Sequence, residues 1–112
     1  MDETCRFDST VGKRLEKIKR IEEMSLSFQG EYFPIISQIT IGRDKKNQIV
    51  LDDTLVSRNH ALIQKIKDAY FIKDLKSTNG TLVNSIKVPQ DKYIKLYKND
   101  IVKIGRTELK IT

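Results

Sequence analysis

Apolar and polar residues alternate in short runs along most of the chain. From about Met24 onward the runs are rich in β-branched and aromatic residues, and turn residues separate them at intervals of about eight to twelve positions. This spacing is typical of an all-β sandwich or barrel, and no long helical pattern interrupts it. We predict eleven strands, at 24–28, 32–36, 38–41, 48–51, 61–66, 70–74, 81–83, 87–88, 93–96, 101–104 and 107–111.

The first two dozen residues follow a different pattern. Residues 13–23 are dense in charge, and Leu15, Ile18 and Ile21 have the spacing of a helix, yet residues 21–27 also alternate as a strand would. We leave these two readings open and expect residues 1–12 to be disordered. The predicted organisation is therefore a short charged N-terminal extension, disordered or partly helical, at 1–23 and one domain at 24–112.

Composition restricts the class of protein. A chain of 112 residues with 38% hydrophobic and 32% charged residues has the size and balance of one globular domain. No apolar run approaches the roughly 18 residues of a membrane span, and the acidic start of the chain is not followed by the apolar segment of a secretory signal. We therefore expect a cytoplasmic protein. The single cysteine, Cys5, predicts no disulfide, metal site or nucleophile, and we expect no cofactor.

The formal net charge of +6 favours acidic partners. Nucleic acid, an anionic membrane and a phosphorylated protein would each satisfy this charge. The lysines are scattered through almost every segment instead of forming a stripe, and aromatic residues make up only 7% of the chain, so binding to nucleic acid is the weaker reading and no membrane partner is expected.

Three short signals lie between the predicted strands from residue 42 to residue 81, and each has an ordinary structural reading when taken alone. The first is Gly42-Arg43, where a strand opens into a polar loop. Glycine allows the backbone to turn or approach another segment closely, and arginine presents a planar fork that can hold two phosphate oxygens.

The second signal is Ser57-Arg58-Asn59-His60, between two strands. Ser57 can donate a hydrogen bond to a phosphate oxygen, and Arg58 adds a second guanidinium. Ser57, His60 and Asp52 or Asp53 could be read as a hydrolase triad. However, no Gly-x-Ser-x-Gly elbow is present, and a single histidine before an apolar strand is more often a hydrogen-bonded structural residue, so we expect no enzyme.

The third signal is Ser77-Thr78-Asn79-Gly80-Thr81. Asn79-Gly80 predicts a tight turn. The hydroxyls of Ser77 and Thr78 just before it would add neutral donors near a site to which arginine already gives charge.

In order and spacing, the three signals resemble the forkhead-associated (FHA) domain, whose pattern of Gly-Arg, Ser-x-x-His and Ser-x-Asn-Gly-Thr is matched over residues 39–84. The resemblance extends to the flanking segment 47–53 and covers roughly residues 24–112. It implies an eleven-stranded β-sandwich whose loops at one end bind an extended phosphothreonine peptide, in signalling downstream of Ser/Thr kinases.

The resemblance also implies a role for each matched residue. Arg43, Ser57 and Thr78 would contact the phosphate, Arg58 would contact the phosphate or the peptide backbone, and Asn79 would bind the peptide backbone. The residues expected to shape and brace the loops are Gly42, His60 and Gly80. Residues 45–47 and Gly105-Arg106 would belong to the loops that read the third residue after the phosphothreonine.

Two positions depart from the family pattern: Asn84-Ser85 stands where glycine usually follows the asparagine, and Asn99 replaces the glycine of a Gly-Asp pair. Both fall in expected turns, which asparagine and serine can adopt at modest cost. A second hypothesis concerns the acidic extension, in which Thr4 or Thr10, once phosphorylated, would occupy the pocket of its own domain and regulate it.

Overall fold

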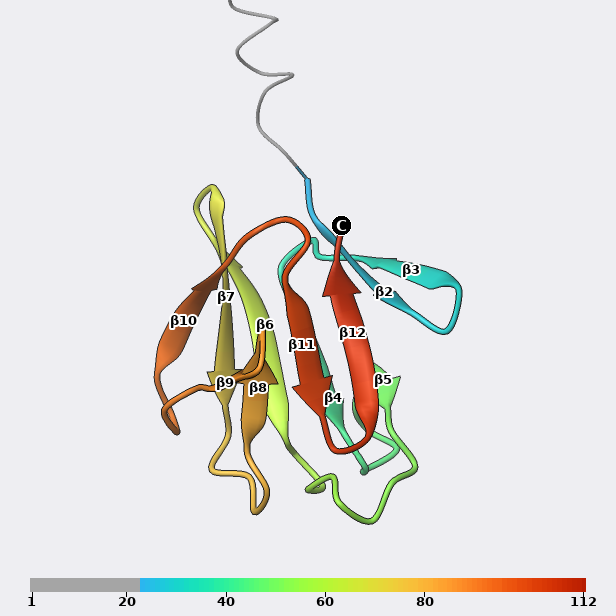
Figure 1. Ribbon diagram of the computed structural model, residues 1–112. Helices are drawn as coiled ribbons and strands as arrows, with labels where there is room; N and C mark the ends of the chain where they lie inside the picture. The colour runs from blue at the N-terminus through green and yellow to red at the C-terminus, as the bar shows by residue number, and fades with distance from the viewer. Residues whose placement is uncertain (1–22) are drawn as a thin grey trace, which may run out of the picture.

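The computed structural model describes residues 23–112, which form eleven strands in two sheets (Figure 1). The expected all-β sandwich is confirmed, with no helix in the part of the chain that the structure describes. The expectations for residues 1–22, including a disordered or helical extension, lie outside the described residues. The strands are β2 (Ser25–Phe28), β3 (Glu31–Pro34), β4 (Gln38–Gly42), β5 (Ile49–Val50), β6 (Ala61–Ile66), β7 (Ala69–Asp74), β8 (Thr81–Val83), β9 (Ile86–Lys87), β10 (Tyr93–Leu96), β11 (Ile101–Ile104) and β12 (Thr107–Ile111).

The five-stranded sheet has the order β10-β7-β6-β4-β5, and the six-stranded sheet has the order β3-β2-β12-β11-β8-β9. All neighbouring strands are antiparallel except β4 and β5. Alternate residues of each strand face the space between the sheets, as the two-residue repeat requires. Ile63 and Ile72 are both fully buried there, for example, and are register partners on β6 and β7.

The core is almost entirely aliphatic. Sixteen buried residues form one cluster, and Tyr70 is its only aromatic member. Burying each Leu or Ile side chain contributes roughly 1.5–3 kcal/mol, so this cluster supplies the main force that holds the two sheets together. The rigid sandwich in turn fixes the ends of the loops. Residues 43–48, 51–60, 75–80 and 105–106 all emerge at the end of the sandwich that lies lowest in Figure 1.

Both departures from the family pattern occupy turns with a left-handed backbone. Asn84 and Ser85 have φ values of 50° and 69°, and Val83 pairs with Ile86, so these two residues form the two-residue turn of the β8–β9 hairpin. Asn99 has a φ of 73°. The tight turn explains why β9 begins at Ile86, one residue before the predicted strand 87–88.

The predicted strand 32–36 also differs from the structure. β3 ends at Pro34, and Ile36 is exposed instead of paired.

Serine at a left-handed position costs energy that glycine avoids. We predict that Ser85→Gly raises the free energy of unfolding by about 0.5 kcal/mol, because relief of the left-handed strain outweighs the extra backbone entropy of glycine. Urea denaturation measures this change. Ser37→Gly serves as the control, since Ser37 is exposed outside the strands and has no positive φ, and it should not stabilise the chain. An equal or lower stability of Ser85→Gly relative to wild type would contradict the prediction.

Candidate functional site

The three sequence signals meet at one pocket on the loop end of the sandwich. The pocket has a volume of about 280 Å³. Five of the residues around it were singled out from the sequence, and three more come from the loop between β5 and β6. The lining residues are Arg43, Thr54, Leu55, Val56, Ser57, Arg58, Thr78 and Asn79. The predicted contact residues are therefore brought together from three separate loops, and we call this hollow the loop pocket.

Arg43 is aimed by the backbone of the facing loop. Its Nε donates a hydrogen bond to the carbonyl of Val56 at 3.0 Å, and its backbone N–H donates to the carbonyl of Ser57 at 3.0 Å. Within residues 23–112, neither the terminal nitrogens of Arg43 nor the guanidinium of Arg58 has a hydrogen-bond partner or an ion pair, and both side chains are exposed. Fixed positive charge is thus available at the mouth of the loop pocket.

Gly42 permits a close approach of two loops. A Cβ at this position would overlap the carbonyl oxygen of Arg58 and lie 2.7 Å from Nδ2 of Asn47. The same Arg58 carbonyl accepts hydrogen bonds from the Asn47 side chain at 2.7 Å and from the Asp44 N–H at 3.2 Å. The side chain of Asn47, expected in a loop that selects the partner, is therefore engaged in holding the Arg58 segment against the loop that follows β4.

Two side chains connect the β5–β6 loop to the β7–β8 loop. Ser57 Oγ accepts a hydrogen bond from the N–H of Thr78 at 3.0 Å, which leaves the Ser57 hydroxyl hydrogen free to be donated. Asn79 Nδ2 donates to the carbonyl of Leu55 at 2.9 Å, and its amide has one further hydrogen and a carbonyl oxygen to offer. The side chains of Thr78 and Asn79 are exposed at the pocket.

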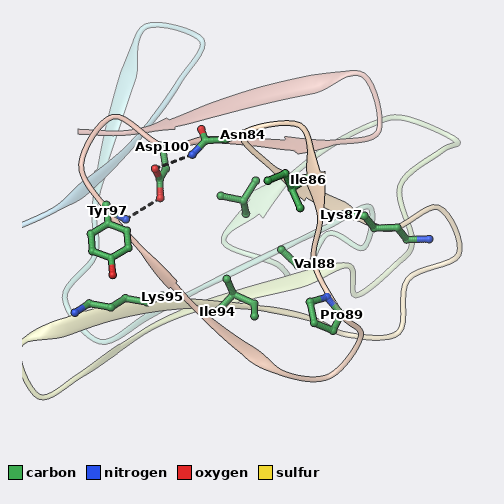
Figure 2. Close-up of a pocket in the computed structure, with 10 residues that line it drawn as sticks. Asn84, Ile86, Lys87, Val88, Pro89, Ile94, Lys95, Tyr97 and Asp100 are labelled. Carbon is green, nitrogen blue, oxygen red and sulfur yellow. Dashed lines mark hydrogen bonds between the residues drawn. The ribbon is translucent and has the colours of Figure 1, made fainter.

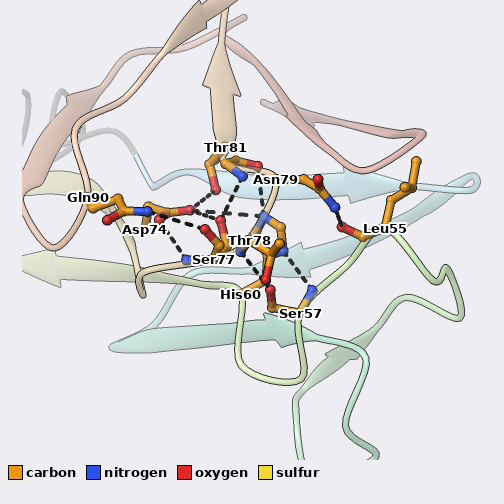
Figure 3. Close-up of polar contacts among 10 residues, drawn as sticks. Leu55, Ser57, His60, Asp74, Ser77, Thr78, Asn79, Thr81 and Gln90 are labelled. Atoms are coloured by element: carbon orange, nitrogen blue, oxygen red, sulfur yellow. Dashed lines mark hydrogen bonds and ion pairs between the residues drawn. The ribbon is translucent and has the colours of Figure 1, made fainter.

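A buried polar network lies beneath these loops (Figure 3). The carboxylate of Asp74 accepts hydrogen bonds from Ser77 Oγ at 2.6 Å, from the Ser77 N–H at 3.0 Å and from Thr81 Oγ1 at 2.7 Å. Ser77 Oγ also accepts from the N–H of Gly80 at 2.9 Å. Asp74, Ser77, Thr81 and His60 are the buried polar side chains within the described residues, and all four lie in this one place.

The expectation that Ser77 serves as a donor near the phosphate is wrong. Its side chain is 2% exposed, and its hydroxyl is used to satisfy Asp74 and Gly80. The sequence contained a signal for this, because a carboxylate followed three residues later by serine often forms a local side-chain to backbone turn. The same pattern could have identified Asp74, which sequence reasoning did not single out as a functional residue.

His60 is completely buried and braces both loops. Its Nδ1 accepts a hydrogen bond from the N–H of Ser57 at 3.0 Å, so Nε2 carries the hydrogen and donates it to the carbonyl of Gly80 at 2.9 Å. Nε2 lies 4.0 Å from Asp74 Oδ1, and Ser57 Oγ is bonded to Thr78 instead of to the imidazole. The alternative of a hydrolase triad therefore has no geometric basis, and the structural role expected for His60 matches its contacts.

Gly80 turns the β7–β8 loop between these anchors. It has a φ of +85°, a conformation that side chains rarely adopt. A left-handed residue is needed here because the N–H of Gly80 points to Ser77 while its carbonyl points to His60. The glycine expected to shape this loop is therefore required by its backbone conformation.

Asp53 ties the pocket to the β11–β12 turn. Its carboxylate accepts hydrogen bonds from the N–H of Leu55 and from the N–H of Arg106, both at 2.9 Å, and lies 3.5 Å from the Arg106 guanidinium. These two N–H groups, together with the Arg106 charge, hold the pKa of Asp53 below its usual value of 3.8. A Cβ at Gly105, whose φ is +61°, would lie 2.7 Å from Asp53 Oδ2. Sequence reasoning assigned Asp53 no such role, since its partner Arg106 is 53 positions away.

No group of three or more His, Cys, Asp or Glu side chains within residues 23–112 could hold a metal ion. The same part of the chain contains no helix long and apolar enough to cross a membrane. Thr4 and Thr10 lie outside the described residues, so self-regulation through a phosphorylated extension stays a prediction.

Comparison with known proteins identifies the family. The family model of the FHA domain matches residues 39–105. A stretch of 71 residues, 63% of this chain, is 37% identical to an ABC transporter ATP-binding/permease protein of Mycobacterium tuberculosis, of which it covers 8%. The chain spans less than half the length of the curated relatives that it matches.

Solved structures agree with the family model. The crystal structure of an FHA domain from Chlamydia trachomatis is similar with a TM-score of 0.75 and 29% identity, over 81% of this chain and 97% of that chain. The MEK1 FHA domain in complex with a HOP1 phosphothreonine peptide gives a TM-score of 0.73 and 26% identity, over 80% of this chain and 94% of that chain. The chain therefore belongs to the FHA family, whose members are protein interaction modules.

The lowered pKa of Asp53 allows a test of its contacts with Leu55 and Arg106. Because the folded-state pKa lies below the unfolded value, the carboxylate stabilises the fold above about pH 3.8, and this contribution is lost as the pH falls through the folded-state value. We predict that Asp53→Asn lowers the free energy of unfolding at pH 7, and that the difference from wild type shrinks once the pH is below about 3.8.

Denaturation in urea at several pH values measures both effects. Asp52→Asn is the matched control, because Asp52 is the exposed neighbour and should show a smaller effect at pH 7. A difference between wild type and Asp53→Asn that stays constant from pH 7 to pH 3 would contradict the assigned cause.

Proposed function

We propose that this chain is a phosphothreonine-dependent interaction module that binds extended phosphopeptides at the loop pocket. The observation that carries the proposal is the convergence of two arginines, three hydroxyl residues and one asparagine amide on that single hollow. A phosphothreonine carries about −1.5 to −2 charges at neutral pH and three acceptor oxygens, so it needs a donor set of this kind.

Each side chain has a role in this proposal that follows from its free hydrogen-bonding groups. Arg43 offers two terminal nitrogens as a fork for two phosphate oxygens, since its Nε is already bonded to Val56. Ser57 and Thr78 donate neutral hydroxyl hydrogens, and Arg58 adds a second positive charge to the lining of the pocket. The carboxylates of Asp53 and Asp74 accept hydrogen bonds from protein donors, and within residues 23–112 no ion pair joins a carboxylate to Arg43 or Arg58.

Asn79 is proposed to hold the peptide backbone next to the phosphothreonine. Its hydrogen bond to the Leu55 carbonyl fixes the orientation of the amide plane. The remaining N–H and the carbonyl oxygen can then pair with one carbonyl and one N–H of an extended peptide. Preorganised donors lower the ordering cost of binding, which is the main reason that a shallow site can be effective.

The expected affinity is moderate. Charge-assisted hydrogen bonds contribute roughly 1.5–3 kcal/mol each, and three of them plus backbone contacts lead to about 8 kcal/mol after ordering costs, which corresponds to a micromolar dissociation constant. Aspartate should substitute poorly for phosphothreonine, because it has one charge and a smaller, planar acceptor group.

Relatives with phosphothreonine ligands support the proposal, as in the MEK1 FHA domain with its HOP1 peptide. A Ser/Thr kinase would act upstream to modify the partner, and we place the module in the cytoplasm, where such kinases work. We assign no catalytic role to any residue. Ser57 Oγ accepts a hydrogen bond from the Thr78 N–H, and His60 Nδ1 accepts one from the Ser57 N–H, so within residues 23–112 no hydrogen bond joins the Ser57 hydroxyl to the imidazole.

The strongest prediction concerns Arg43. We predict that Arg43→Ala lowers the affinity for a phosphothreonine peptide at least about tenfold, since a bidentate charged contact is lost, while the free energy of unfolding changes little. Isothermal calorimetry with a peptide selected from an oriented phosphothreonine library measures the affinity, and the library also reveals the preference at the third residue after the phosphothreonine.

The control is Lys110→Ala, which removes one exposed positive charge from β12, away from the loop pocket. Equal losses in both variants would indicate a general charge effect. Binding to nucleic acid would then be favoured by a steep fall of affinity with salt and by failure of the phosphopeptide to compete. An unchanged affinity of Arg43→Ala would refute the assigned site.

A further inference from the structure

A second hollow lies on the open side of the sandwich, apart from the loop pocket (Figure 2). It has a volume of about 350 Å³ and is mostly apolar. Its lining residues are Val83, Asn84, Ile86, Lys87, Val88, Pro89, Ile94, Lys95, Tyr97 and Asp100. We call it the side groove. It shares no lining residue with the loop pocket.

The side groove exists because two edge strands face each other there. β9 is the last strand of the six-stranded sheet, and β10 is the first strand of the five-stranded sheet. Ile86 comes from one edge and Ile94 from the other, and Figure 2 shows their side chains on opposite sides of the hollow. Ile86 is 72% exposed and Tyr97 is 58% exposed. Exposed apolar surface along unpaired strand edges is costly for a monomer and is typical of a contact surface.

The polar groups of the groove rim are already satisfied by one another. Asn84 Nδ2 donates to Asp100 Oδ1 at 2.9 Å, and Asp100 Oδ2 accepts from the N–H of Tyr97 at 2.8 Å. The charges that remain are positive, with Lys87 at one end and Lys95 at the other, where its Nζ lies 5.3 Å from the centre of the Tyr97 ring. The groove therefore suits a segment with an apolar anchor and acidic neighbours.

Residues 1–10 of this chain have that composition. Phe7 supplies an aromatic anchor, and Asp2, Glu3 and Asp8 outnumber the single Arg6. They carry a net negative charge in a chain whose formal net charge is +6. Their charge is thus complementary to the lysines of the side groove.

The point where the chain joins the domain lies close to the groove. The N–H of Ser25 donates to the carbonyl of Thr112 at 2.9 Å, and the N–H of Asn99 donates to the carbonyl of Ile111 at 2.7 Å. Neighbouring strands lie about 5 Å apart, so Ser25 is within roughly two strand spacings of the Tyr97–Asp100 turn. The stretch between Phe7 and Ser25 spans up to roughly 60 Å when extended, and a short tether gives a millimolar effective concentration.

We propose that residues 1–10 dock in the side groove of their own domain, with the Phe7 ring between Ile86 and Ile94 and the carboxylates facing Lys87 or Lys95. This inference does not depend on phosphopeptide binding at the loop pocket. Docking covers Thr4 and Thr10, so it competes with any kinase that modifies them. The free and docked states of the segment therefore set how readily the extension can be phosphorylated.

The sole cysteine of the chain provides the test. A nitroxide attached to Cys5 in the full chain broadens the nuclear magnetic resonance signals of nearby groups. Docking predicts strong broadening of the Ile86, Val88 and Ile94 methyl signals. The signals of Leu55, at the loop pocket, should stay sharp. Phe7→Ala should lower the docking equilibrium constant about tenfold and restore the broadened signals, because the buried anchor is lost.

Variants of the groove separate docking from general proximity. Ile86→Asp should abolish the broadening at Ile94, whereas Ile66→Asp, a matched change at an exposed isoleucine outside the groove, should leave it intact. Broadening centred on Ile36, which is exposed near Met24, would place the segment elsewhere and overturn the proposal. So would uniform weak broadening.

Intermolecular docking is a separate outcome. A spin-labelled chain without isotopes is mixed with an isotope-labelled Cys5→Ser chain that carries no nitroxide. Broadening of Ile86 in this mixture would assign the groove to a second copy and overturn docking within one chain. A phosphopeptide titration of the same samples reports on the loop pocket independently, so failure of one proposal is distinguishable from failure of the other.

Discussion

The buried carboxylate of Asp74 is the constraint on which the rest of the site depends. A carboxylate removed from water is tolerated only when hydrogen bonds replace its lost solvation. Asp74 receives them from both donors of Ser77 and from the Thr81 hydroxyl. Because Ser77 lies within the β7–β8 loop and Thr81 directly follows it, these hydrogen bonds define the shape of the loop. That shape directs Thr78 and Asn79 outward to the pocket.

His60 connects the buried network around Asp74 to the exposed loop residues. Its two ring nitrogens join the Gly80 carbonyl to the Ser57 N–H, so the β5–β6 loop is placed relative to the β7–β8 loop. Ser57 then receives the Thr78 N–H, and the Val56 carbonyl next to it orients Arg43. Arg43 and Ser57, both proposed to bind phosphate, are therefore held by groups that do not touch the ligand, which is how a water-exposed site can be preorganised.

Most of the fold could be predicted from the sequence because strand patterns and turn residues are local. All eleven strands were expected, and errors occurred at edges such as β9, where the left-handed Asn84 and Ser85 shorten the turn. The exposed candidates Arg43, Ser57, Arg58, Thr78 and Asn79 were also found, because their order along the chain follows a family pattern. Ser77 was misread, and the Asp53 anchor was missed, since burial and the Asp53 partner Arg106 depend on the folded chain.

The buried network controls binding at the loop pocket without touching the ligand, and Thr81→Val is the variant that tests this role. This change keeps the side-chain shape but removes the hydrogen bond to Asp74. The affinity for a phosphothreonine peptide should fall at least about threefold in a variant that stays folded. Without the Thr81 hydrogen bond the β7–β8 loop is less ordered in the free protein, and binding must then order it at a cost in free energy. Tyr93→Phe, which removes a hydrogen bond to Gln64 on the outer face of the other sheet, should bind as wild type does. Wild-type affinity in Thr81→Val, measured by calorimetry, would contradict this role of the buried network.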